Sequence, residues 1–200
     1  MLLPIAAMAA TVLASNVLVQ FLLGDWLTWG ALTYPLAFLV NDVTNRLHGP
    51  AAARRVVLWG FAAGLLASGV GTQVEGAFGP LVSWRVALGS GLAFLAAQMA
   101  DVAIFDRLRG GAWWRAPLAS TVVGSALDTA LFFTIAFSAA LALPPAWGDV
   151  SWANAPVPLL GAGPVLPLWA SLALADWGVK MAVAALALVP FRQITRNRAT

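Results

Sequence analysis

The sequence predicts an all-α integral membrane protein, a compact bundle of six transmembrane helices. Of its 200 residues, 61% are hydrophobic, and only 8 are acidic and 11 are basic. Soluble domains are about half apolar and about a quarter charged, so this composition excludes a soluble enzyme and a disordered chain. The mean hydropathy of +0.85 supports the same class. The sequence has no cysteine, which excludes disulfides, thiol catalysis and cysteine–metal sites.

Six apolar runs are long enough to cross a bilayer, which requires about 20 residues per helix. We expect these helices at about 2–23, 27–47, 56–74, 82–108, 117–143 and 166–189. The first run has neither a positively charged leader nor a small-residue cleavage site, so we interpret it as a retained helix. His48-Gly49-Pro50 predicts the end of the second helix, and Pro190 predicts the end of the sixth. No composition shift divides the chain, and we expect residues 1–200 to form a single domain.

Arginines gather in the loops and the tail at one end of the predicted bundle. They are Arg46, Arg54, Arg55, Arg107, Arg109, Arg115, Arg192, Arg196 and Arg198. Loops rich in Lys and Arg stay in the cytoplasm, so we expect this end and both termini to be cytoplasmic. The opposite loops carry Asp25, Glu75 and Asp149, with Arg85 as their one cation. Among these loops, the segment 144–164 is long enough to hold structure of its own.

Ionisable side chains inside the predicted helices are candidate functional residues, because each costs several kcal/mol in hydrocarbon unless it is paired or hydrated. They are Asp42, Asp101, Asp128, Asp176 and Lys180. Asp128 lies about midway along the fifth helix, on one face with Thr121, Gly124 and Ser125. Close helix packing explains the small residues but not the carboxylate. We therefore interpret Asp128 as part of a site or a pathway.

Asp176 and Lys180 are four residues apart on the sixth helix, so they share one face. Two interpretations stay open, a structural ion pair and a role in binding. Ionisable groups on the last two helices are most easily satisfied when they face one another. We therefore expect Asp128, Asp176 and Lys180 to face a shared cavity, with a carboxylate accepting hydrogen bonds from a substrate.

Two further polar clusters lie nearer the basic loops. Gln98 and Asp101 share a face of the fourth helix, and Asp101 is about two turns from the arginines that follow. An ion pair of Asp101 with Arg107 or another residue of the basic loop is the favoured interpretation. Asn41 and Asp42 lie near the cytoplasmic end of the second helix, where we expect a hydrogen-bond network at the helix end.

Missing motifs narrow the function further. The sequence has no G-x-x-x-x-G-K-[ST] segment, so it does not hydrolyse ATP by that route. Its one histidine, His48, lies in a basic loop, and there is no second histidine to complete a metal site. We therefore expect no metal and no cofactor. A net charge of +3 on so apolar a chain does not indicate nucleic-acid binding. Gly60 and Gly64 have the spacing of a close helix contact, which is compatible with a homodimer.

Four segments resemble the VUT family of queuosine-precursor transporters, in order and in spacing. They are TWGALTYPLAFLVNDVTNRLHGPAAARRVV, SWRVALGSGLAFLAAQMADVAIFDRLR, WWRAPLASTVVGSALDTALFFTIAF and ALADWGVKM. The resemblance covers most of the chain from about Thr28 to Val189. Most of the family's polar positions fall on residues that are also candidates on physical grounds, because a charged or polar side chain is unfavourable inside a membrane helix. These positions are Asn41, Asp42, Thr44, Arg46, Gln98, Asp101, Asp128, Thr129, Asp176 and Lys180.

The resemblance implies a bacterial inner-membrane importer of 7-deazaguanine bases, the cyano and aminomethyl precursors of the tRNA nucleoside queuosine. It also implies a fold similar to the substrate-capture subunits of energy-coupling-factor transporters. The expected partners are the small base and the lipid bilayer, with no nucleic acid. The substrate-binding residues expected on these grounds are Asp128, Asp176, Lys180, Gln98, Asn41, Asp101 and Asp42.

Two alternative functions stay open. One is a capture subunit of a vitamin or nucleobase uptake system, which would need separate energising proteins. Uptake by the purified chain alone would separate this function from that of an autonomous transporter. The other is a membrane enzyme, because intramembrane carboxylates can also hold metal ions. Metal-independent binding of a deazaguanine would count against the enzyme.

Overall fold

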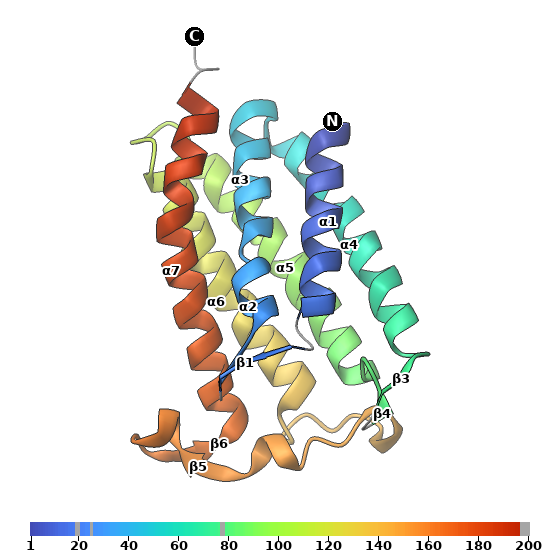
Figure 1. The fold of residues 1–200 in the computed structure, drawn as a ribbon. Coiled ribbons are helices and arrows are strands. Elements are labelled where there is room, and N and C mark those ends of the chain that lie inside the picture. The colour runs from blue at the N-terminus through green and yellow to red at the C-terminus, as the bar shows by residue number, and fades with distance from the viewer. Residues whose placement is uncertain (19–20, 25, 77–78, 197–200) are drawn as a thin grey trace.

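The computed structural model describes residues 1–18, 21–24, 26–76 and 79–196, which form a bundle of helices packed side by side (Figure 1). Its helices are α1 (Leu2–Leu18), α2 (Trp29–Thr33), α3 (Leu36–His48), α4 (Pro50–Gly71), α5 (Trp84–Leu108), α6 (Arg115–Phe137) and α7 (Leu168–Arg196). Helices α4, α5, α6 and α7 are each long and apolar enough to cross a membrane, and α1 is a shorter apolar helix of 17 residues. The predicted all-α membrane class is therefore supported.

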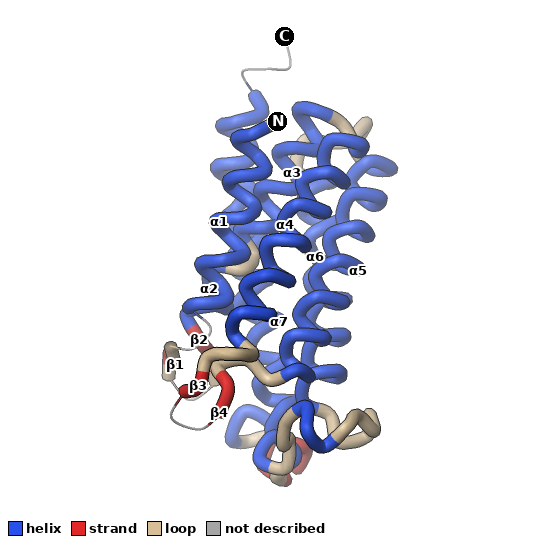
Figure 2. Tube along the Cα trace, turned by 90° about the vertical axis from the view of Figure 1, so that its right-hand side faces the viewer, coloured by secondary structure: helices blue, strands red, loops and turns tan. Residues whose placement is uncertain are grey.

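Short antiparallel strand pairs lie at one end of the bundle (Figure 2). They are β1 (Leu22–Leu23) with β2 (Leu27–Thr28), β3 (Glu75–Gly76) with β4 (Gly79–Pro80), and β5 (Pro156–Pro158) with β6 (Val165–Pro167). Each is too short to form a separate layer, so the helices alone build the body of the molecule.

Several predicted helix ends need correction. The first helix ends at Leu18, not near 23, because β1 and β2 turn the chain back. The second is interrupted between Thr33 and Leu36, where Pro35 lacks the N–H that a continuous helix needs. The third begins at Pro50, not near 56, because proline suits the first turn of a helix.

The last two helices also differ from the prediction. The fifth ends at Phe137, not near 143, because the side chain of Asn154 binds the Phe137 carbonyl (2.9 Å) and the Ala139 N–H (3.2 Å). The sixth continues through Pro190 to Arg196. The ring of Phe191 is 1% exposed and packs against Phe105 with centroids 6.1 Å apart, which holds this turn in place.

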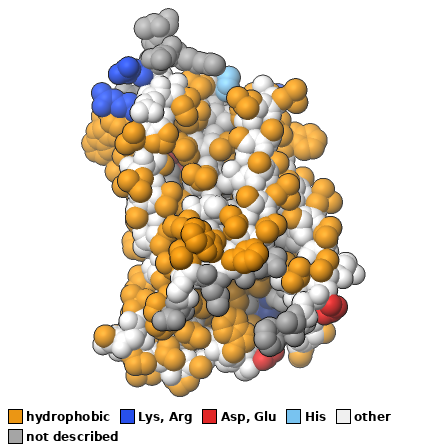
Figure 3. Space-filling view, viewed as in Figure 1, with side chains coloured by type: hydrophobic (Ala, Val, Ile, Leu, Met, Phe, Trp, Pro, Cys, Tyr) orange, Lys and Arg blue, Asp and Glu red, His pale blue; other side chains and the backbone are white. Residues whose placement is uncertain are grey.

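The two ends of the bundle differ in charge. The N-terminus, the C-terminal end of α7 and the turn between α3 and α4 lie at one end (Figure 1), where arginine side chains gather (Figure 3). Gly49 makes this turn with φ 83, a left-handed conformation that favours glycine. The opposite end carries the strand pairs and the segment 144–167. Asp25 and Arg198, which also entered the charge pattern, lie outside the described residues.

The segment between α6 and α7 has structure of its own, as the sequence predicts. It contains the 3-10 turns η1 (Pro145–Trp147), η2 (Trp152–Asn154) and η3 (Leu159–Gly161), and the hairpin of β5 and β6. The side chain of Asn154 ties it to the end of α6, as described above, and also donates to the Val150 carbonyl at 2.7 Å. The segment thus closes the end of the bundle opposite the termini.

The main apolar core lies between α1, α3, α4 and α5. Glycine lets α4 approach α1 closely, because a Cβ at Gly60 would lie 2.4 Å from the Met8 side chain. A Cβ at Gly64 would lie 3.0 Å from Val12. This glycine pair therefore packs two helices within one chain, and it no longer supports the predicted homodimer.

Candidate functional site

A cavity of about 480 Å³ lies inside the bundle, in the half nearer the segment 144–167. Its walls come from α1, α2, α4, α5, α6 and α7, with Trp152 of the connecting segment beside them. Most of the lining is apolar and much of it aromatic, including Phe61, Phe94, Phe132 and Phe133. Cavities that hold small molecules typically measure about 300–1,000 Å³ and combine apolar walls with a few polar groups. This cavity therefore has the size and lining of a ligand site.

The charged part of the wall is a cluster on α6 and α7. Lys180 lies between two carboxylates, with its Nζ 2.7 Å from Asp128 Oδ2 and 2.5 Å from Asp176 Oδ2. It also donates to the hydroxyl of Thr129 at 3.0 Å, and that hydroxyl donates to Asp176 at 2.9 Å. All three charged side chains line the cavity. We call Asp128, Asp176 and Lys180 the charged triad.

The triad is nearly closed to solvent. The Lys180 and Asp128 side chains are only 4% and 6% exposed, whereas Asp176 is 15% exposed. Two carboxylates and one ammonium leave a formal charge of −1 on the cavity wall. Such a wall offers carboxylate oxygens to a ligand's N–H donors, whereas the three N–H groups of Lys180 already donate to Asp128, Asp176 and Thr129.

The structure places Tyr34 at the triad, although it is not among the residues that the sequence predicts for the site. Its hydroxyl donates to Asp128 Oδ1 at 2.9 Å, and Lys180 Nζ lies 5.4 Å from the centre of its ring. Tyr34 stands in the break between α2 and α3, beside Pro35. Its signal in the sequence is that it is the one tyrosine of the chain and precedes a proline within an apolar run.

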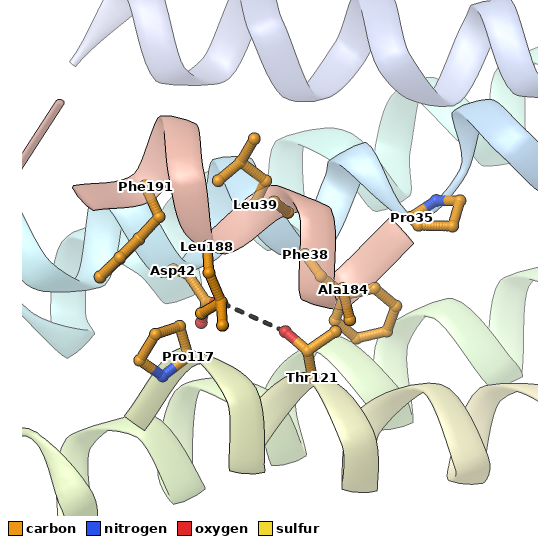
Figure 4. Close-up of a pocket in the computed structure, with 10 residues that line it drawn as sticks. Pro35, Phe38, Leu39, Asp42, Pro117, Thr121, Ala184, Leu188 and Phe191 are labelled. Carbon is orange, nitrogen blue, oxygen red and sulfur yellow. Dashed lines mark hydrogen bonds between the residues drawn. The ribbon is translucent and has the colours of Figure 1, made fainter. Parts of the chain in front are cut away.

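A second polar cluster lies between α3, α5 and α6, around the side chains of Asp42 and Asp101. We call these two residues the carboxyl pair. Ser120 and Thr121 donate to the two oxygens of Asp42, at 3.1 and 3.2 Å. Asn41 donates to Asp101 Oδ2 at 2.9 Å, and a Cβ at Gly124, one turn from Ser120 and Thr121, would lie 3.4 Å from the Asp101 Cβ. Figure 4 shows Asp42 and Thr121 at the edge of a small pocket between α3, α6 and α7.

Two expectations about this second cluster are wrong. Asp101 has no ion pair with a basic residue in the part of the chain that the structure describes, because it turns toward α3 while Arg107 is exposed. Six residues apart, the two side chains lie on different faces of α5. Asn41 and Asp42 belong to the interior, not to a helix end, since α3 continues to His48.

Arginines at the two ends of the bundle bind backbone carbonyls of neighbouring helices. Arg109 donates to the carbonyl and the side-chain oxygen of Asn45, at 2.5 and 2.9 Å, and Arg46 donates to the Arg109 carbonyl at 2.9 Å. These bonds fasten the end of α3 to the end of α5. At the other end, Arg85 is 4% exposed and donates to the Ile135 and Ser138 carbonyls, at 3.2 and 2.6 Å. Arg85 thereby satisfies carbonyls at the C-terminus of α6.

Apolar helices around a charged cavity of ligand size define a membrane protein that binds small molecules. Residues 28–194 match the family described as "Putative vitamin uptake transporter", and the chain belongs to that family. This match confirms the resemblance found in the sequence. With several apolar helices of spanning length, the chain is a multi-pass membrane protein of a transporter family.

Three curated relatives carry a more specific name. The chain is 40% identical over 139 residues to the "Queuosine precursor transporter" of Escherichia coli (strain K12), covering 62% of each chain. It is 37% identical over 121 residues to the "Probable queuosine precursor transporter" of Haemophilus influenzae, covering 55% of this chain and 52% of the relative. It is 34% identical over 136 residues to the protein of that name in Bacillus subtilis (strain 168), covering 58% of each.

The chain thus spans between half and two thirds of the length of the relatives it matches. No solved structure matches it. The names of the family and the relatives agree with the prediction of a transporter and do not indicate an enzyme.

Proposed function

We propose that this protein imports queuosine precursors, 7-cyano-7-deazaguanine or 7-aminomethyl-7-deazaguanine, across a bacterial inner membrane. The observation that carries the proposal is the charged triad on the wall of a cavity of about 480 Å³. The names of the relatives supply the substrate class. The triad residues Asp128, Asp176 and Lys180 are the proposed substrate-binding residues.

The chemistry of a deazaguanine fits this wall. One edge of the base presents a ring N–H and an exocyclic amine, and this donor pair suits a carboxylate of Asp128 or Asp176. Its carbonyl oxygen would accept from the ammonium group of Lys180 by taking the place of one of that group's three present partners. The flat ring would stack on an aromatic side chain of the lining, such as Phe132 or Phe133 on the turn that follows Asp128.

The proposed arrangement in the membrane has six crossings. Helices α2 and α3 together make one crossing, and α1, α4, α5, α6 and α7 make the others, in a single domain that resembles the energy-coupling-factor capture subunits. The arginine-rich end and both termini face the cytoplasm. Cysteines introduced at Asp149 and Arg196 should then label from opposite sides of intact spheroplasts. Labelling from the same side would contradict this arrangement.

The other predicted substrate-binding residues stand apart from the cavity. Asn41, Asp42, Gln98 and Asp101 belong to the second polar cluster, and none of them lines the large cavity among the described residues. Substrate contact by these four residues stays a prediction. A capture subunit would use the same cavity, and uptake by the purified chain alone would exclude that alternative.

The test of the proposed function is nutritional. Cells that cannot make deazaguanines but express this protein should regain queuosine in tRNA when given either base at low concentration. Asp128→Asn should abolish the recovery at equal expression, whereas Asp106→Asn, at an exposed ion pair with Arg109, should leave it intact. Recovery no better than an empty vector gives would contradict the proposal.

A further inference from the structure

The carboxyl pair lies outside the lining of the substrate cavity, and the contacts proposed for the base are those of the charged triad. We propose that Asp42 and Asp101 form a proton-binding site, and that import is coupled to the passage of a proton through it. This inference rests on the proposed function, because a coupling site requires a transported substrate.

Both side chains of the pair are buried from solvent. Asp42 is 3% exposed and Asp101 is 0% exposed. Both oxygens of Asp42 accept from the hydroxyls of α6, and one oxygen of Asp101 accepts from Asn41. Both carboxyls face α6 within one turn of each other, because Thr121 donates to Asp42 and a Cβ at Gly124 would lie 3.4 Å from the Asp101 Cβ.

Within the described residues, no element packed around the pair places a compensating cation on it. On α3, Arg46 is one turn from Asp42, but its guanidinium lies over the Phe105 and Phe191 rings, at 5.2 and 5.9 Å. The same guanidinium donates to the Arg109 carbonyl. On α7, Lys180 is held by the triad. Helix α1 has no ionisable side chain, and α6 presents only hydroxyls here.

Other arginines of the neighbouring elements are engaged elsewhere or exposed: Arg192 of α7 lies over the Trp113 ring at 4.7 Å, and Arg107 and Arg115 are exposed. Arg54 and Arg55 of α4 are exposed, and Arg109 of the α5 end binds Asp106 at 3.1 Å. Within the described residues, therefore, no cation forms an ion pair with either carboxyl. Two adjacent ionised carboxylates without a counter-ion are strongly unfavourable in a buried site. A bound proton removes this penalty.

Unpartnered polar atoms provide a second, independent observation. Asn41 Oδ1, Asp101 Oδ1 and both amide atoms of Gln98 have no hydrogen-bond partner among the described residues, although all three side chains are 0% exposed. A buried acceptor without a donor costs about 1–3 kcal/mol. Three of these four atoms are oxygens, so donors are what the cluster lacks. A proton on the free oxygen of Asp101 supplies one.

A small pocket beside Asp42 has room for a water molecule that could relay the proton. The small pocket in Figure 4 has a volume of about 10 Å³, which is room for about one water molecule. Asp42 and Thr121 lie on its wall, together with Pro117 and Leu188. A water there that has received a proton from solvent can pass one on to the Asp42 carboxylate: an O–H bond forms on Asp42 as one O–H bond of the hydronium breaks, and the reverse transfer releases the proton.

Helix α6 links the two sites. Thr121 binds Asp42, and Asp128, seven residues or about two turns further on, binds Lys180 on the same face. A shift of α6 on substrate binding would move the hydroxyl partners of Asp42, and protonation of Asp42 would shift α6 in return. Such reciprocity is required of coupled binding sites.

The experiment uses the full chain in proteoliposomes and 7-cyano-7-deazaguanine as the probe, because this base lacks the basic aminomethyl group that would carry its own proton. An inward proton gradient should drive the wild-type protein to accumulate the labelled base, and an inward sodium gradient should not. Asp42→Asn and Asp101→Asn should lose accumulation at least 10-fold while exchange of labelled for unlabelled base stays within about 3-fold. Asp106→Asn is the matched control and should accumulate normally.

The outcomes separate the two proposals. Absence of both binding and exchange in the wild-type protein would overturn the proposed function. Normal exchange with accumulation that survives in both variants, or that follows sodium, would overturn the proton site alone. If the variants do not fold, a pH-sensitive dye inside wild-type vesicles decides the question. Entry of the base should acidify the lumen, and an unchanged lumen would overturn the coupling.

Discussion

Replacement of Lys180 by methionine tests the energetics of the charged triad. Methionine retains much of the length and apolar volume of the side chain but removes the ammonium group. The change breaks two ion pairs, at 2.7 and 2.5 Å, and the hydrogen bond to Thr129 at 3.0 Å. Asp128 and Asp176 then face each other without a cation.

The structure sets the expected magnitude. The Lys180 and Asp128 side chains are 4% and 6% exposed, so water cannot replace the lost partner. Removing one member of a buried ion pair typically costs about 3–5 kcal/mol. We expect the free energy of unfolding of Lys180→Met to fall by about that amount. Asp176→Asn should cost much less, because the pair between Lys180 and Asp128 stays intact.

The assay is equilibrium unfolding in detergent micelles, followed by the helical circular dichroism signal. Asp106→Asn is the control, since its partner is 36% exposed, and exposed pairs contribute about 0–1 kcal/mol. Adding Asp128→Asn and Asp176→Asn to Lys180→Met removes all three charges and should restore most of the stability. A loss below about 1 kcal/mol for Lys180→Met, or no recovery in the triple variant, would refute the reasoning.

Further predictions concern packing, capping and the connecting segment. Gly124→Ala should destabilise the protein by about 1–3 kcal/mol, because the new Cβ would lie 2.8 Å from an aromatic carbon of α3, whereas Gly69→Ala meets nothing within 4 Å and should not destabilise it. Arg85→Met should cost about 2–3 kcal/mol in the same unfolding assay by leaving carbonyls of α6 unpaired, with only partial recovery in Arg85→Lys. Ser151 donates two hydrogen bonds to Asp149, at 2.6 and 3.0 Å, and these hold the pKa of that carboxyl below its ordinary value. These contacts stabilise the segment while Asp149 is ionised, and this stabilisation is lost as the pH falls through its lowered pKa. Ser151→Ala should therefore raise the pKa of Asp149 in an NMR titration. An unchanged pKa would contradict the assignment.

Much of the fold was predictable because membrane-spanning helices follow directly from apolar runs. The fourth helix, expected at 82–108, is found at Trp84–Leu108. The prolines show where such reasoning stops. Pro35 interrupts a helix, whereas Pro190 lies inside one, where Phe191 is packed against Phe105. The same residue type thus has two outcomes, and tertiary packing decides between them.

The candidate site was predictable in its charges but not in its pairing. The cost of a buried charge selects Asp128, Asp176 and Lys180, and spacing predicts the contact between the last two. The bond from Lys180 to Asp128 joins residues 52 positions apart, which no local pattern encodes. Tyr34 was missed for the same reason, since its partner Asp128 is 94 positions away.

The central claim is that the triad binds a deazaguanine inside the cavity, and direct binding to the purified chain tests it. Titration calorimetry with 7-aminomethyl-7-deazaguanine should detect a single site in the wild-type protein. Asp128→Asn exchanges an acceptor for a donor at nearly constant shape, and losing a charge-assisted hydrogen bond of about 1.5–3 kcal/mol should weaken binding by roughly 10- to 150-fold. Asp106→Asn should bind as the wild type does. Equal affinity of Asp128→Asn and the wild-type protein would contradict the account and place the substrate elsewhere in the bundle.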